Sequence, residues 1–173
     1  GGGAAPGAGL GSSVSALFHI TGMLASLAAG VLADRFGRTP VIFAMAALSA
    51  LCSLVFGWLI GGPVWIVVAV GLVYGFAALG DSPIYSTAIT EVVAPAYRGA
   101  ALALRSLAGY GAGAAAPLVF GWVLDLHGGG RGVGAGWGWA FVTLAAAGAL
   151  AAASAVALHR LPEAHVLRGG HRG

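Results

Sequence analysis

The chain has 173 residues, of which 59% are apolar and only 8% carry charge, and its mean hydropathy is +0.94. A soluble domain carries about 25% charged residues, so this composition excludes a soluble fold and indicates a protein embedded in lipid. The net charge of +3 comes from dispersed arginines, which argues against nucleic acid as a partner. A single cysteine, Cys52, excludes an intrachain disulfide and a thiolate metal site.

Five stretches are long and apolar enough to cross a bilayer as helices, which need about 20 mostly apolar residues. Helices are expected because isolated strands cannot satisfy their backbone hydrogen bonds in lipid. The expected fold class is therefore an all-α integral membrane bundle of about five transmembrane helices. In chain order, the expected spans are residues 10–32, 40–60, 64–90, 99–124 and 137–158.

The connectors between these spans alternate between basic and nearly uncharged, which predicts the topology. Cytoplasmic connectors are enriched in arginine and lysine. The second and fourth connectors hold only Arg131. The N-terminus is therefore expected outside the cell, and the C-terminal tail, residues 159–173, is expected in the cytoplasm. The arginines of the first connector, the third connector and the tail are Arg35, Arg38, Arg98, Arg160, Arg168 and Arg172.

Proline and glycine interrupt two of the spans. Pro83 lies late in the third span, and Pro117 lies in the fourth, after Gly109, Gly111 and Gly113. One interpretation is close helix packing, because small residues let backbones approach each other in lipid. The other is a bend used in gating, since proline removes a helical hydrogen bond and kinks the helix.

The segment between the first two spans carries the strongest local motif, Gly30-Val-Leu-Ala-Asp-Arg-Phe-Gly-Arg-Thr-Pro40. A small helix end is followed by a carboxylate, by two guanidiniums and by a glycine that permits a tight turn. These charges can pair with one another or with the start of another helix, where the dipole favours a carboxylate. The segment resembles the signature loop of the major facilitator superfamily. The matching residues are Gly30, Leu32, Asp34, Arg35, Gly37 and Arg38.

In that family of transporters, the loop follows the second span of each six-helix half and acts as a cytoplasmic latch between helices. Weaker likenesses follow in the family's order, at Pro95–Leu104 and at Trp137–Phe141. The resemblance implies that residues 1–173 form part of the C-terminal half, spans 8 to 12 of a twelve-span fold. The short tail after the last span favours this half. The N-terminal half is then missing, and the chain is expected to be a fragment.

Ionisable groups inside a span are costly and mark candidate sites. Tyr74, Asp81 and Tyr85 are expected on one face of the third span, at helical spacings of seven and four. The resemblance implies that this helix lines the central cavity. A carboxyl group flanked by phenols could there bind a cation or a proton, or fix a polar substrate. A purely structural ion pair is the alternative.

Arg105 and His19 are the other candidate cavity residues. Arg105 lies about two turns inside the fourth span, at a depth similar to that of Asp81. Three interpretations stay open: a structural Asp81–Arg105 pair, contact of Arg105 with an anionic substrate, and proton coupling through Asp81. His19 is a candidate proton relay, or else it is hydrogen-bonded to a neighbouring helix. The same face of the first span holds Ser12, Ser15 and Ser26.

The charges at the cytoplasmic end form a second candidate site, a latch that is tight when that side of the transporter is closed. Asp34 is expected near the start of the fourth span, close to Arg98. The residues expected in the latch are Gly30, Asp34, Arg35, Gly37, Arg38, Glu91 and Arg98.

The resemblance implies secondary active transport of a small solute by alternating access, as a symporter or antiporter with a proton or ion. The implied partners are the lipid bilayer of the plasma (cell inner) membrane, the solute and the missing half. No cofactor, metal or enzymatic activity is expected. A channel-like or non-transporting protein is the alternative. An intramembrane enzyme is disfavoured, because neither a Gly-x-Ser-x-Gly nor a His-Glu-x-x-His motif is present.

Overall fold

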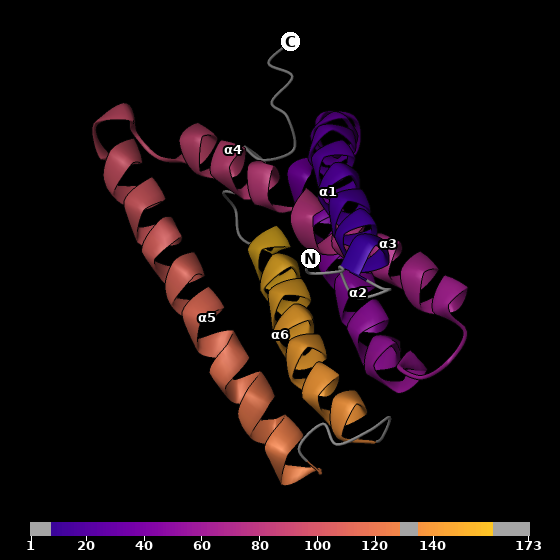
Figure 1. Cartoon of the computed structure of the whole chain (residues 1–173). Coiled ribbons are helices and arrows are strands. Elements are labelled where there is room, and N and C mark those ends of the chain that lie inside the picture. Colours follow the sequence, from indigo (N-terminus) through magenta and orange to yellow (C-terminus); the bar gives the residue numbers. More distant parts are fainter. Residues whose placement is uncertain (1–7, 129–134, 161–173) are drawn as a thin grey trace, which may run out of the picture.

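Figure 1 shows the computed structural model of the chain, which describes residues 8–128 and 135–160. These residues form helices joined by short turns. Most of the expected tail, with Arg168 and Arg172, lies outside the described residues, as does Arg131. The elements are α1 (Ala8–Phe36), α2 (Arg38–Phe56), η1 (Gly57–Leu59), α3 (Val64–Gly80), α4 (Ser82–Val92), η2 (Pro95–Tyr97), α5 (Arg98–Leu126) and α6 (Ala135–His159).

Each of the five expected spans corresponds to a helical segment that is long and apolar enough to cross a membrane. This agreement confirms the all-α membrane class expected from hydropathy. Large apolar side chains such as Leu27, Val31 and Leu150 lie exposed on the outside of the bundle, as a surface in contact with lipid tails requires. The segments are Ala16–Phe36, Arg38–Leu59, Val64–Val92, Pro95–Leu126 and Gly136–Leu158.

Small residues hold the bundle together. α2 packs most extensively against α6 and also against α3, which packs in turn along α1. At the α2–α6 contact, a Cβ added to Gly148 would lie 3.0 Å from the Cβ of Ala50. Such close approach gives helices their dispersion contacts in lipid, where the hydrophobic effect does not drive association. The core is built by Ala29, Ala33, Val41, Ile42, Met45, Ile84 and Ala155.

The third span is divided into two helices by a bend at Asp81. Pro83 has no backbone N–H to donate to the carbonyl of Leu79, and its ring crowds that carbonyl. α3 therefore ends at Gly80, and α4 starts again at Ser82. Pro117 behaves differently, because it lies inside the continuous helix α5.

α5 stands at the edge of the bundle and has no buried residue (Figure 1). Its contact with α6 is aromatic: the ring centroid of Phe120 lies 5.3 Å from that of Phe141 and 6.2 Å from that of Trp137. A Cβ added to Gly109 or Gly113 would meet no atom within 4 Å. The described helices therefore do not pack on these glycines, and their roles in packing or gating stay predictions.

Candidate functional site

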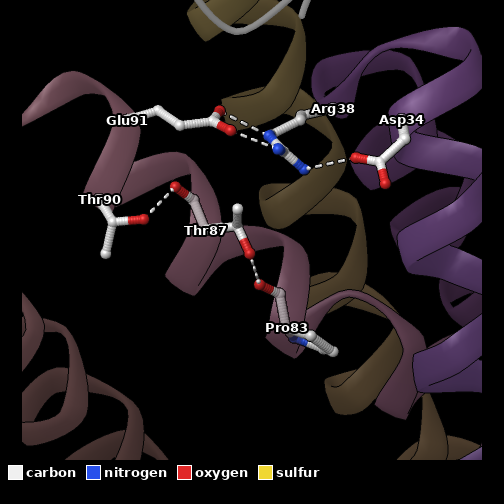
Figure 2. A network of polar contacts seen from close by, with 6 residues as sticks. All are labelled: Asp34, Arg38, Pro83, Thr87, Thr90 and Glu91. Atoms are coloured by element: carbon white, nitrogen blue, oxygen red, sulfur yellow. Dashed lines mark hydrogen bonds and ion pairs between the residues drawn. The ribbon is translucent and has the colours of Figure 1, made fainter.

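A cluster of charges lies where α2 begins, close to the end of α4 (Figure 2). Arg38 donates from Nε to Oε2 of Glu91 at 2.6 Å, and its Nη2 donates to Oε1 of the same carboxylate. Its Nη1 lies 3.5 Å from Oδ1 of Asp34. The Arg38 side chain is 12% exposed, against 34% for Glu91 and 74% for Asp34. The two-fold contact between Arg38 and Glu91 is therefore the main bond of these three residues, which we call the latch cluster.

The local backbone places Arg38 and Glu91 where each charge is unfavourable without the other. Gly37 joins α1 to α2 at φ 91° and ψ 153°, a conformation that glycine adopts without strain. Arg38 is consequently the first residue of α2, at the positive end of the helix dipole. Glu91 is the penultimate residue of α4, at the negative end. Each charge is unfavourable on its own helix, and the ion pair neutralises both.

Gly30 lies inside α1, where an added Cβ would meet no atom within 4 Å.

Arg98 does not join the latch cluster as expected. Its Nε donates to the carbonyl of Val93, 3.1 Å away, at the C-terminal end of α4. The last carbonyls of a helix lack helical donors, and a guanidinium can satisfy one of them. Within the described chain, Asp34 pairs with Arg38, so the expected Asp34–Arg98 contact is not formed. Arg35 lies over the ring of Phe36, with Cζ 5.6 Å from the ring centroid.

Two pockets open beside the start of α4. The α1 pocket lies between α1 and the α3–α4 bend and measures about 460 Å³. The α5 pocket lies between α4 and α5 and measures about 310 Å³. Ser82 lines both. The other polar residues of the α1 pocket are His19, Ser26 and Ser86. The α5 pocket is completed by Arg105, Ser106, Gly109 and Tyr110.

Arg105 binds the first residue of α4 and not the carboxylate expected as its partner. Its Nη2 donates to the carbonyl oxygen of Ser82 at 2.9 Å and to the Ser82 hydroxyl at 3.1 Å. Asp81 is near enough to interact electrostatically with Arg105. In the described part of the chain, however, the two side chains form no ion pair within 4.0 Å. The direct Asp81–Arg105 pair considered from the sequence is therefore absent.

The two tyrosines predicted beside Asp81 line neither pocket. The ring centroid of Tyr74 lies 6.1 Å from that of Phe56, which places Tyr74 in the aromatic contact between α3 and α2. Tyr85 packs against the buried core near Ile84. Asp81 keeps a helical backbone, with φ −80° and ψ −26°, and Tyr85 lies near enough to interact electrostatically with Asp81, as residues four apart on one helix face do.

Several pocket residues were not singled out from the sequence. Ser82 with Ser86, and Ser106 with Tyr110, are hydroxyl pairs four residues apart in apolar spans. That spacing places both members of a pair on one helix face. Paired hydroxyl groups in an apolar span therefore predict a polar surface on that helix. His19 and Arg105 were singled out, and the structure places one in each pocket. Within the described residues, no group of three or more His, Cys, Asp or Glu could hold a metal ion.

Comparison with known proteins places these features in a family context. Residues 3–172 match the family model described as Major Facilitator Superfamily. No match was found among curated proteins or solved structures. The matched range includes the latch cluster and both pockets.

Proposed function

Because the chain belongs to the Major Facilitator Superfamily, we propose that it carries a small solute across the membrane by alternating access, as part of a longer transporter. Transport is secondary active and is driven by the gradient of the solute or of a coupled proton or ion, in symport or antiport. The transporter lies in the plasma membrane. The latch cluster faces the cytoplasm, where it holds that side closed.

The observation that carries this proposal is that one short helix, α4, connects the pockets to the latch cluster. Ser82 at its start lines both pockets, and Glu91 near its end pairs with Arg38. Residues 82 and 91 lie about 14 Å apart along a helix. Because the bend at Asp81 separates α4 from α3, α4 can tilt as a rigid rod. A tilt that breaks the latch cluster would reshape both pockets, which is the coupling that alternating access requires.

The five helices act as spans 8 to 12 of a twelve-span fold. The signature loop follows α1, and in the family this loop follows the second span of a half. The first helix of the same half, and the N-terminal half, would then cover the pockets. One observation supports this arrangement: α5 has no buried residue, which leaves its surface available to further helices.

Thiol labelling from the two sides of the membrane tests the proposal without knowledge of the solute. The native full-length protein, with Cys52→Ala and any further cysteines removed, would carry Ser86→Cys in the α1 pocket. A membrane-impermeant maleimide is applied to right-side-out and to inside-out vesicles. Alternating access predicts labelling from both sides. Adding Glu91→Gln should raise the rate from the latch side and lower it from the other side, because the two exposures compete.

The control is Ser154→Cys, because Ser154 is exposed on α6 outside both pockets and should face lipid. It should label poorly from either side. A rise from both sides on adding Glu91→Gln would indicate a channel-like protein. Labelling of Ser86→Cys from one side only would contradict alternating access.

A further inference from the structure

We propose that the α5 pocket binds an anionic group of the transported solute, an oxyanion such as a carboxylate or a phosphate. This inference rests on the proposed transport function and specifies the chemical class of the solute. Arg105 would bind the anion, and the hydroxyls of Ser106 and Tyr110 would donate to it.

The first argument is the incomplete pairing of Arg105. A guanidinium has five N–H donors, and a charge inside a membrane span is costly unless it is compensated. In the described residues, Arg105 forms hydrogen bonds through Nη2 alone, and both go to neutral oxygens of Ser82. The Nε and Nη1 donors therefore remain for the two-pronged contact that arginine makes with carboxylates and phosphates.

The second argument is the lining of the pocket. A fixed cation and three hydroxyl-bearing residues line it, and no carboxylate does. Asp81, the nearest carboxyl group of the third span, is not a lining residue. A cationic solute group would therefore be repelled by Arg105, whereas an oxyanion would be attracted and could accept hydrogen bonds from every polar group present.

The third argument is space. The pocket volume of about 310 Å³ lies at the lower end of the range of about 300–1,000 Å³ found for small-molecule sites, which suits a small organic anion. Gly109 contributes to the room: a Cβ added there would meet no atom within 4 Å, so no side chain fills the space beside Ser106 and Tyr110.

The test uses the purified full-length protein and measures saturable shifts of its melting temperature. The probes are the sodium salts of phosphate, acetate and succinate at constant ionic strength, with glucose and choline chloride as the neutral and cationic comparisons. At least one oxyanion should stabilise the protein where glucose and choline do not. Arg105→Gln should weaken its affinity about tenfold or more, and Arg105→Lys should retain part of it. If no oxyanion stabilises the protein, or if Arg105→Gln binds as well, the proposal is wrong.

Further variants keep Arg105 in place, in case its loss disturbs folding. Ser106→Ala and Tyr110→Phe should each weaken oxyanion affinity by about two- to tenfold. The matched control is Tyr97→Phe, an exposed tyrosine of η2 that should have no effect. Asp81→Asn should leave the affinity equal or tighter, because it removes a neighbouring negative charge. Weaker binding would contradict the proposal, because it would mean that the anion needs the Asp81 carboxyl group.

The outcomes separate this inference from the proposed function. If two-sided labelling of Ser86→Cys occurs without oxyanion binding, transport by alternating access stands and the anion site is wrong. If an oxyanion binds through Arg105 but labelling comes from one side only, the binding site stands and the transport mechanism is wrong.

Discussion

Substitution of Glu91 by glutamine should weaken the latch cluster far more than substitution of Asp34 by asparagine. Both changes remove one negative charge and keep the shape of the side chain. The two carboxylates differ in their contact with Arg38. Glu91 receives two hydrogen bonds from a guanidinium that is only 12% exposed. Asp34 is 74% exposed and lies 3.5 Å from the guanidinium.

The expected magnitudes follow from these contacts. A charge-assisted hydrogen-bonded pair at a poorly solvated site is worth about 1.5–3 kcal/mol. Removal of the Glu91 charge also relieves its repulsion from the negative end of α4, roughly 0.3–1 kcal/mol. The net cost of Glu91→Gln is therefore about 0.5–2.7 kcal/mol in free energy of unfolding. Asp34→Asn should cost less than about 1 kcal/mol, as for exposed ion pairs.

A double-mutant cycle between Arg38→Gln and Glu91→Gln measures the interaction directly. Unfolding would be followed by far-ultraviolet circular dichroism in mixed detergent micelles of increasing denaturing power. The loss from the double variant should be smaller than the sum of the single losses by at least about 1 kcal/mol. A second cycle, between Arg38→Gln and Asp34→Asn, should show much weaker coupling. If the Arg38–Glu91 losses add within about 0.5 kcal/mol, the pair contributes nothing and the reasoning fails.

Three other substitutions test the backbone and the packing. Gly37→Ala should destabilise the protein by about 1–2 kcal/mol, because φ is 91° there, whereas Gly30→Ala in α1 should be neutral or stabilising in the same unfolding assay. Gly57→Ala should cost about 1–3 kcal/mol, because its Cβ would crowd the backbone of Trp137. Pro83→Ala should restore the missing hydrogen-bond donor, straighten the third span and diminish the reciprocal change in Ser86→Cys labelling caused by Glu91→Gln.

The membrane fold could be predicted from the sequence because hydropathy is a property of each segment alone. A stretch such as residues 40–60 is apolar enough to span the bilayer whatever its neighbours are. The position of the bend was also marked, since Pro83 removes a donor wherever it lies in a helix. The surroundings of the two tyrosines were predicted only in part: Tyr85 lies near enough to Asp81 to interact with it electrostatically, whereas the contact of Tyr74 with Phe56 of α2 cannot be read from the spacing within one span.

Long-range contacts were predicted less well, because they depend on packing between helices that are distant in sequence. Arg105 was recognised as a charge that is costly within its span, but its contact with Ser82 depends on how α5 lies beside the start of α4. The preference of Arg98 for the carbonyl of Val93 likewise depends on where α4 ends. The residue types indicated where charge had to be compensated, while the packing of the helices and the end of α4 determined which groups could reach each charge.

The same dependence explains why Glu91, and not Asp34, is the principal partner of Arg38. Asp34 and Arg38 are four residues apart, and the turn at Gly37 leaves Asp34 largely exposed. Glu91 lies 53 residues from Arg38 and reaches it from another helix. A bond between α1 and α2 across the turn at Gly37 would not report the proposed tilt of α4, whereas a bond between α2 and α4 would break with it. Each charge lies at the unfavourable end of its own helix. Separation of the pair would therefore cost additional free energy, because each charge would then face the dipole of its own helix without a partner.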